Sequence, residues 1–248
     1  MKVSDITVDY LDHMGSDLTV VQSARVSFNK FAEVKVEHDG QEFTEILPVS
    51  KNSRDFSKWD EDRDPKLIAY LAEHGHWSPF AHAFLQIRVK APIFVARQLV
   101  KHQIGLCWNE VSRRYVDSEP EFYVPELRKR AENVKQGSSS EVVLSVKDED
   151  GFELDGQGVL KRMFTLSLQC YETLLKNGAA PEIARSVLPQ SMMTEWVWSG
   201  SLYAFARVCN LRLDSHAQKE TRLVAEQIFK LLETHFPVST KALINVGD

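Results

Sequence analysis

Alternation of apolar and polar residues marks the strands of this chain. Residues 33–37 alternate strictly ahead of a His-Asp-Gly sequence, and they lie in a segment, 17–50, that is rich in β-branched and aromatic side chains. This pattern predicts a β-hairpin with a glycine-containing turn. Residues 84–89 carry aliphatic side chains at every second position, which predicts a half-exposed strand.

Apolar residues spaced three or four apart predict the helices. Asp64 is expected to cap one helix, with Pro65 in its first turn and Gly75 at its end. A second helix is expected between Pro92 and Gly105, with two polar stripes on its surface. The remaining helices, which would make the C-terminal third helical, are expected over residues 159–178, 181–189 and 201–211 and beyond a capping box of Ser215 and Gln218.

The segments between these elements define the organisation of the chain. Residues 116–156 combine prolines, a Gly-Ser run and an acidic turn, so we expect an irregular excursion there. Since no repeat or break in composition divides the chain, residues 1–248 are expected to form one domain of mixed α and β structure.

Composition narrows the classes of function. The chain has 43% hydrophobic and 26% charged residues, as a folded globular protein does. Its net charge of −5 gives no general attraction to nucleic acid or acidic membranes, so an anionic ligand is expected to be small. The sequence predicts neither a membrane span nor a signal peptide, and we expect a cytoplasmic protein. The three cysteines are odd in number and far apart, which is typical of reduced thiols.

Three polar clusters are candidates for chemistry. Residues 101–115 gather cations, neutral donors and a carboxylate beyond a helix end, which suits an oxyanion or a nucleotide, although a solvated helix end has the same composition. Residues 74–82 hold three histidines, for which a packed or cofactor-facing loop is favoured over a metal site. Arg212 is expected either to clamp an anion or to pair with Asp214 or Glu220.

Nucleophilic catalysis has little support in the sequence. No motif places a general base beside Cys107, Ser112 lacks the glycine pattern of a hydrolase elbow, and neither nucleotide-binding glycine motif occurs. If the protein is an enzyme, we expect a cofactor to carry the difficult chemistry.

Several short motifs stand in a fixed order along the chain. They are Ala24-Arg25-Val26-Ser27-Phe28, His74-Gly75-His76-Trp77-Ser78-Pro79-Phe80, Lys90-Ala91-Pro92-Ile93-Phe94-Val95-Ala96-Arg97-Gln98, Asn109-Glu110-Val111-Ser112-Arg113-Arg114-Tyr115, Ala184-Arg185-Ser186-Val187-Leu188-Pro189 and Leu211-Arg212-Leu213-Asp214-Ser215-His216-Ala217-Gln218. In this order they resemble the flavin-dependent thymidylate synthases, which methylate deoxyuridylate with a reduced flavin. The resemblance covers nearly the whole chain.

The chain departs from the family pattern at several places. Lys101-His102-Gln103 replaces the family's Arg-His-Arg, and one residue more than in the family separates this triplet from Ser112. Ala81 stands where the family usually has glutamate. Ser201-Leu202-Tyr203 stands where it has asparagine-x-arginine, and Arg207, one helical turn later, can replace some of the lost donors. The segment 30–62 is longer than the shortest members require, which indicates an inserted hairpin and loop.

The resemblance implies a fold and a reaction. The fold would be α/β (α+β), a small and largely antiparallel sheet flanked by helices, assembled as a homotetramer with sites between subunits. The reaction would be the reductive methylation of dUMP to dTMP, with 5,10-methylenetetrahydrofolate as carbon donor, NADPH-reduced FAD as hydride source and no cysteine nucleophile. The partners would be these small molecules, without nucleic acid, membrane or metal.

The resemblance also implies the site residues. Arg212 would be catalytic, because a fixed cation polarises the pyrimidine and favours ionisation at N3. The residues expected to bind dUMP are Gln98, Lys101, Glu110, Ser112, Arg113, Arg114, Arg185 and Arg212. Those expected to bind FAD are His76, Ser78, Lys101, His102, Gln103, Asn109, Glu110, Ser201, Tyr203 and Arg207.

Other interpretations compete with these. Glu110 can instead form a surface ion pair with Arg113 or Arg114, and Arg25 can be a structural partner of a carboxylate. A related protein that kept the fold and a nucleotide pocket but lost its flavin would explain Gln103, Ala81 and Ser201. A nucleic-acid-binding protein is a third candidate, which conflicts with the acidic balance of charge.

Overall fold

The structure is a computed structural model, and it describes residues 1–248 apart from 29–30, 39–40, 49–57, 117, 133–136 and 246–248. The strands are β1 (Lys2–Val3), β2 (Thr7–Met14), β3 (Phe31–His38), β4 (Gln41–Pro48), β5 (Phe84–Pro92), β6 (Leu106–Glu110), β7 (Glu121–Phe122), β8 (Arg128–Arg130), β9 (Ser138–Val142), β10 (Ser145–Lys147), β11 (Glu153–Asp155) and β12 (Met193–Ser201). The helices are α1 (Asp17–Arg25), α2 (Asp64–Glu73), α3 (Ile93–Leu99), α4 (Gly156–Lys176), α5 (Pro181–Ala184), α6 (Leu202–Arg212), α7 (Lys219–His235) and α8 (Pro237–Leu243). Short 3₁₀ turns are η1 (Val26–Phe28), η2 (Ser78–Ala81) and η3 (Arg185–Val187).

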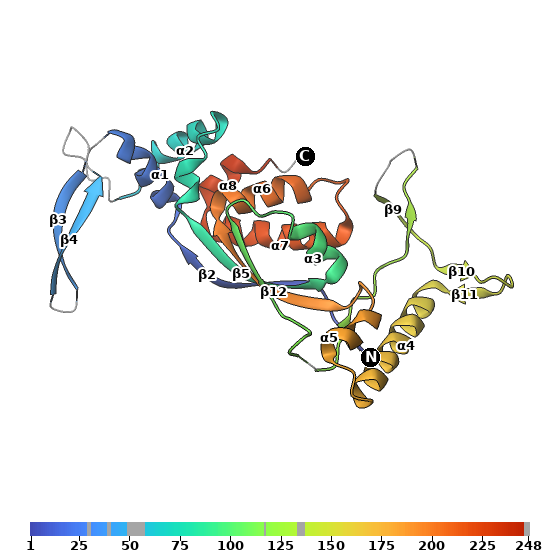
Figure 1. The fold of residues 1–248 in the computed structure, drawn as a ribbon. Coiled ribbons are helices and arrows are strands. Elements are labelled where there is room, and N and C mark those ends of the chain that lie inside the picture. Colours follow the sequence, from blue (N-terminus) through green and yellow to red (C-terminus); the bar gives the residue numbers. More distant parts are fainter. Residues whose placement is uncertain (29–30, 39–40, 49–57, 117, 133–136, 246–248) are drawn as a thin grey trace.

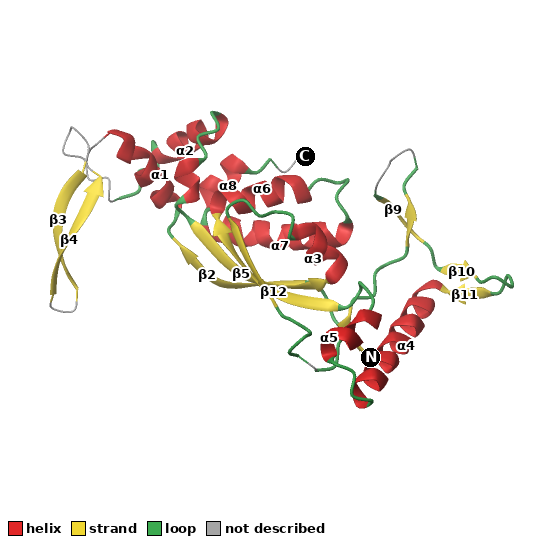
Figure 2. Ribbon diagram, in the orientation of Figure 1, coloured by secondary structure: helices red, strands yellow, loops and turns green. Residues whose placement is uncertain are grey.

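An antiparallel sheet in the order β2–β5–β12–β6 forms the centre of the molecule. Helices α3, α6, α7 and α8 lie on one face of it (Figure 1), and the distribution of helix and strand is shown in Figure 2. The main hydrophobic core lies between this face and the helices, and it includes the fully buried Trp196 and Trp198 of β12. Side chains of β5 alternate between buried and exposed, so the opposite face of this strand is open in the described part.

A second, smaller hydrophobic cluster joins α4 and α5 to the start of β12. Phe122, Phe164, Leu168 and Tyr171 are buried there, and the rings of Phe122 and Phe164 stack 5.5 Å apart. Figure 1 shows this part at one end of the molecule and the hairpin of β3 and β4 at the other. The central sheet therefore lies between two peripheral parts of the chain.

The fold class and several elements confirm the sequence predictions. The chain is mixed α and β with a small antiparallel sheet. Strands β3 and β4 pair as the predicted hairpin, although its turn, residues 39–40, lies outside the described residues. Strand β5 contains the predicted strand 84–89. The described residues of the excursion 116–156 hold only short strands until α4 begins.

Four predicted elements need correction near the site and at the N-terminus. The helix expected between Pro92 and Gly105 ends at Leu99, and residues 106–110, expected to be loop, pair with β12 as β6. The N-cap of α2 is Arg63, not Asp64. Asp64 is the first residue of the helix, and its buried carboxylate pairs with the Arg25 guanidinium at 2.5 Å. That ion pair confirms the structural interpretation of Arg25. Part of the segment 17–50 is helical, as α1, because its turns pack against α2 and η2.

The C-terminal third is not wholly helical, which is the largest error. β12 occupies residues 193–201 and is a central strand of the sheet. The capping box of Ser215 and Gln218 is also wrong: α7 begins at Lys219, and Gln218 is its N-cap without a side-chain cap bond. α4 begins at Gly156 rather than at 159, since Asp155 accepts a hydrogen bond from the Gly158 amide at 2.7 Å.

Candidate functional site

A turn between α3 and β6 contacts the start of α6 and forms the centre of the candidate site. The Gly105 carbonyl accepts a hydrogen bond from the Ser201 amide at 3.2 Å. A Cβ at Gly200 would lie 2.5 Å from that carbonyl oxygen, and Gly105 has a φ of +77°. Only glycine allows both the left-handed conformation and this close approach without strain. The two glycines therefore fix the turn that carries Lys101, His102 and Gln103 against α6.

Arg212, at the end of α6, points to this turn. Its Nε donates to His102 Nε2 at 3.1 Å, and its Nη2 donates to the Gln98 backbone oxygen at 3.5 Å. The expected pairing with Asp214 or Glu220 is wrong. The structure thus brings together three residues that the sequence assigned to the site: Gln98, His102 and Arg212.

His102 is neutral in this arrangement. Burial lowers its pKa from the usual value of 6.5, and the charges of Arg212 and Arg207 lower it further. Because Arg212 donates to Nε2, the ring proton is on Nδ1, which leaves this N–H directed away from the guanidinium. Burial also lowers the pKa of Arg212, which remains a cation at neutral pH.

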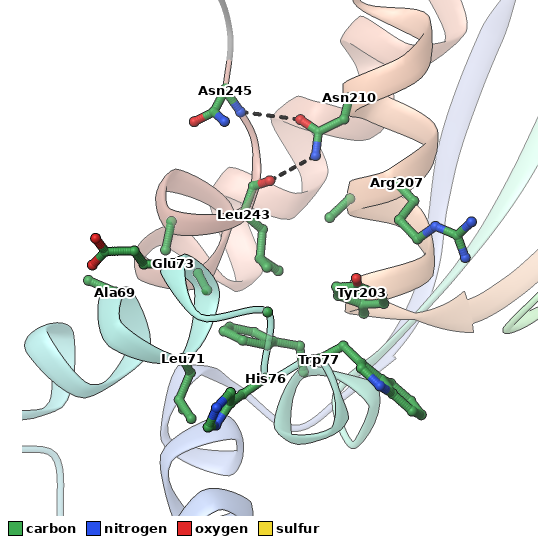
Figure 3. A pocket seen from close by; sticks show the side chains of 15 residues that line it. Ala69, Leu71, Glu73, His76, Trp77, Tyr203, Arg207, Asn210, Leu243 and Asn245 are labelled. Carbon is green, nitrogen blue, oxygen red and sulfur yellow. Dashed lines mark hydrogen bonds between the residues drawn. The ribbon is translucent and has the colours of Figure 1, made fainter.

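Two adjoining cavities open along α6, one of them beside the turn. One, of about 650 Å³, is lined largely by apolar groups and has Gly105, Cys107 and Ser201 in its wall. The other, of about 590 Å³, lies between α2, α6 and α8 (Figure 3). Trp77, Tyr203 and Arg207 line both cavities. Both volumes lie in the range of small-molecule and cofactor sites.

Figure 3 shows the side chains that line the second cavity. Asn210 faces the C-terminal segment, where it donates to the Leu243 carbonyl at 2.8 Å and accepts from the Asn245 amide at 3.2 Å. The Arg207 guanidinium points away from this pair, and the ring of Trp77 lies 6.1 Å from that of Tyr203. His76 lines the same cavity. The cavity therefore combines aromatic rings with an exposed cation.

These residues fit a flavin. A planar aromatic ring system suits an apolar cavity bordered by Trp77 and Tyr203, and Arg207 supplies a cation for an anionic group. Ser201 is only 6% exposed, and its hydroxyl oxygen accepts from the Ala204 amide at 3.2 Å as the N-cap of α6. Its O–H remains able to donate. Ser78 is exposed at the start of η2, and Lys101, Gln103 and Asn109 are exposed on the turn and on β6.

A second group of site residues lies around the end of β6. Glu110 accepts from the Thr194 hydroxyl at 2.7 Å and from the Trp108 indole at 3.1 Å, so the surface ion pair proposed for it is wrong. Ser112 Oγ accepts from the backbone amide of Arg114 and from its Nε, both at 3.3 Å. Arg113 donates to the Ser118 carbonyl. These contacts order the loop that follows β6.

Arg185 stands apart from both groups. It is exposed beyond α5, where its Nε donates to the Glu182 carbonyl at 3.3 Å. A single copy of the chain therefore presents the predicted nucleotide ligands in three places: the turn with Arg212, the loop after β6, and α5.

Sequence reasoning assigned no role in the site to Trp77, Asn210 or Arg128. Trp77 belongs to a motif that carried the resemblance, and its place directly after His76 in that motif was the available signal. Asn210 and Arg128 gave no local signal, because their partners Leu243 and Glu220 are distant in the chain.

Comparison with known proteins identifies the fold. Residues 9–238 match the family model described as "Thymidylate synthase complementing protein". The chain is 36% identical to a flavin-dependent thymidylate synthase of Kosmotoga olearia over 94% of this chain and 87% of the relative, and 35% identical to that of Thermotoga neapolitana over 96% and 90%. Among solved structures, a UMP/dUMP methylase, PolB from Streptomyces cacaoi bound with 5-Br dUMP, has a TM-score of 0.74 at 31% identity and covers 98% of this chain and 96% of its own.

The fold, the cation-bearing cavities and these matches define the class of the protein, an enzyme of nucleotide methylation. Within that class, the chain belongs to the family of flavin-dependent thymidylate synthases. In the described part of the chain, no helix is long and apolar enough to span a bilayer.

Proposed function

We propose that the protein catalyses the reductive methylation of dUMP to dTMP, with 5,10-methylenetetrahydrofolate donating the carbon and NADPH-reduced FAD donating the hydride. The names of its relatives and the binding of 5-Br dUMP by the Streptomyces cacaoi methylase support this proposal. The observation that carries it is a half-buried cation, Arg212, held by neutral partners at the turn whose Gly105 lines the cavity of about 650 Å³.

Arg212 is able to stabilise negative charge on a substrate. Among the described residues its side chain contacts an imidazole and a backbone carbonyl, and no carboxylate neutralises it. When N3 of the pyrimidine loses its proton, the negative charge spreads over the ring and its oxygens, and a fixed guanidinium stabilises that charge without reorganisation. C5 then becomes electron-rich enough to accept the one-carbon unit, and the C5 hydrogen leaves as a proton.

The other residues divide between nucleotide and flavin. Beside Arg212, the nucleotide would be bound by Gln98, Lys101, Glu110, Ser112, Arg113, Arg114 and Arg185, with the arginines suited to phosphate and carbonyl oxygens. FAD would be bound by His76, Ser78, Lys101, His102, Gln103, Asn109, Glu110, Ser201, Tyr203 and Arg207. When bound, it would supply the hydride that completes the methyl group. No cysteine nucleophile is needed.

The proposed assembly is a homotetramer with sites shared between copies of a single 1–248 domain. Helix α5, which Arg185 follows, lies apart from α6, which ends at Arg212 (Figure 1), and this separation supports an arrangement in which different copies supply the two arginines to one nucleotide. A cytoplasmic location completes the proposal.

The reaction is tested by release of tritium from C5-labelled deoxyuridylate in the presence of 5,10-methylenetetrahydrofolate and NADPH, with and without FAD. Release that depends on FAD is the expected result. Release of tritium without any flavin, or none in either condition, would contradict the proposal. Visible absorbance of the purified protein after addition of FAD separates loss of flavin binding from loss of chemistry.

Arg212→Ala is expected to lower deoxyuridylate conversion by at least about 10²-fold, since it removes the cation that stabilises the ionised pyrimidine. Circular dichroism should show an unchanged fold, because Arg212 lies outside both hydrophobic clusters. Cys107→Ala serves as the control, because Cys107 lines the cavity beside the turn, and it should retain most activity. Wild-type turnover in Arg212→Ala would remove the proposed role, and complete loss in Cys107→Ala would indicate a covalent thiol mechanism.

A further inference from the structure

Two amide side chains link a buried carboxylate to the residues around Arg212. Gln98 Nε2 donates to Gln218 Oε1 at 2.5 Å, and Gln218 Nε2 donates to Glu220 Oε2 at 3.0 Å. Gln98 Oε1 accepts a hydrogen bond from the Thr221 hydroxyl at 3.2 Å. A continuous chain of hydrogen bonds therefore runs from the first turn of α7 to α3.

Glu220 is paired with an arginine from the 116–156 excursion. Its side chain is 0% exposed, and Arg128 Nη2 lies 2.7 and 2.9 Å from its two carboxylate oxygens. Arg128 lies on β8 and also donates through Nε to Ser138 Oγ at 2.8 Å. A carboxylate paired in this way is ionised, because arginine keeps its charge and a protonated partner would leave this cation with only the more distant Glu126, at 3.8 Å, as a counter-charge. Glu220 can therefore only accept hydrogen bonds.

The ionised carboxylate sets the direction of every bond in the chain. Gln218 must turn its NH₂ group toward Glu220, so its carbonyl oxygen faces Gln98. Gln98 must then present its NH₂ group to Gln218 and its oxygen to the Thr221 hydroxyl. Neither amide can rotate by half a turn without placing like groups face to face, which is costly inside a protein.

Gln98 is also a residue that holds Arg212, through its backbone oxygen. Gln98 thus carries the amide of fixed direction on its side chain, and its backbone oxygen contacts the cation proposed to polarise the pyrimidine. The proposed reaction uses neither Gln218 nor Glu220, although their hydrogen bonds end on a proposed nucleotide ligand.

We propose that Glu220 is a positioning residue: through Gln218 it fixes which end of the Gln98 amide faces the nucleotide and thereby favours uracil over cytosine. This inference rests on the proposed function, in which Gln98 binds dUMP. Uracil presents a donor at N3 beside an acceptor at O4, whereas cytosine presents an acceptor at N3 beside the N4 amino donor. An amide of fixed direction complements one of these edges, and an amide free to rotate accommodates both.

The test compares the binding of dUMP and dCMP to two variants. Gln218→Met breaks the chain of bonds and leaves the buried pair of Arg128 and Glu220 intact, so the fold should be kept. In Glu220→Gln, Arg128 holds the new amide by its oxygen, which turns the NH₂ group toward Gln218 and reverses the chain. In both variants, equilibrium dialysis of the FAD-loaded protein should show the ratio of the dCMP to the dUMP dissociation constant falling by about tenfold.

Lys219→Met is the matched control. Lys219 stands in the same turn between Gln218 and Glu220, but its side chain binds the exposed Glu126 at 2.6 Å, so the ratio should stay at the wild-type value. A purely structural role for Glu220 would weaken the binding of both nucleotides equally and leave the ratio unchanged in the two test variants, and this result would overturn the inference.

If Gln218→Met fails to fold, the result for Glu220→Gln decides alone. If the wild-type protein binds no dUMP, the proposed function fails and the inference falls with it; a wild-type protein that binds dUMP without preferring it to dCMP overturns the inference alone.

Discussion

At the scale of single residues, the contact between Arg212 and His102 makes a histidine behave as a neutral group. The imidazole accepts from the guanidinium, and proton uptake at Nε2 would break that hydrogen bond and place two cations together. His102 thus links the position of the proposed catalytic cation to pH.

Acidification is expected to destabilise the protein through His102. Burial first, and then the charges of Arg212 and Arg207, hold its pKa in the folded protein below the 6.5 of the unfolded chain. The unfolded chain therefore binds the proton more readily, so the contribution of His102 to stability is complete above 6.5 and declines as the pH falls below that value. Titration of the His102 ring by NMR should show the lowered pKa.

Arg212→Met provides the control for this prediction. Removal of the guanidinium charge should raise the pKa of His102 toward its usual value, because one of the charges that lowers it is gone. A His102 pKa that is the same in both proteins, at the value of a free imidazole, would contradict the arrangement.

The three thiols are expected to react unequally. Burial raises the pKa of Cys209 to about 12, whereas Cys107 and Cys170 are exposed. A thiol must ionise and be reached in order to react. A disulfide reagent of the Ellman type should therefore modify two thiols in the native protein and the third only after unfolding. Cys209→Ala should remove the slow fraction, and three fast thiols in the wild-type protein would disprove the burial.

Sequence reasoning found the residues of the site whose chemistry is local, and it missed those that act through distant partners. Arg212 and His102 were found separately from motifs, but their contact depends on packing of α6 against a turn that is about a hundred residues earlier in the chain. Glu220 was considered only as a partner of Arg212. Its actual partner, Arg128, comes from a segment expected to be irregular.

At the scale of elements, β12 is a strand that the sequence analysis did not predict, and the reason lies in its position in the chain. Trp196 and Trp198 alternate with Val197 and Ser199, so the period of a strand is present. The segment lies between two helical patterns, and its burial depends on pairing with β5 and β6, which lie far away in sequence. The helix of residues 64–75 and the strand of residues 84–89 were predictable because their signals, a proline start and an aliphatic alternation, are contained within the element.

Asp17→Ala is expected to destabilise α8. The Asp17 carboxylate, 7% exposed on α1, accepts from the backbone amides of Val238 and Ser239 at 2.8 and 2.9 Å. Loss of both bonds leaves two amides at a helix start unpaired, which should lower the free energy of unfolding by about 2 kcal/mol. Urea denaturation measures this loss. Glu233→Ala, an exposed position on α7, should change stability by less than about 0.5 kcal/mol, and an equal effect of the two would refute the cap.

At the scale of the whole molecule, the excursion 116–156 is joined to the body by charged contacts at the start of α7. Arg128 reaches Glu220, and Glu126 binds Lys219 at 2.6 Å. The second hydrophobic cluster supports the same region from α4. Although the net charge of the chain is −5, the fold brings cationic side chains together at the site.

Mixed assemblies should reveal whether sites are shared between copies. Arg212→Ala and Arg185→Ala are each expected to be inactive alone, because each removes a proposed nucleotide ligand. If the two arginines at one site come from different copies, random co-assembly leaves about a quarter of the sites with both, and activity should return to that extent. Co-expression of the two variants with different tags and purification through both tags provides the sample. No recovery would show that both arginines act within one copy.

The strand order has a consequence for the growing polypeptide on the ribosome. Within the central sheet β6 pairs only with β12. About eighty residues separate these two strands in the sequence, so the ribosome must synthesise that length before β6 can pair. Until the later strand emerges, the nascent chain exposes the edge of β5 and all of β6, and such unpaired edges favour association with other chains. Chaperone binding to arrested nascent chains should therefore fall once residues 193–201 have left the exit tunnel.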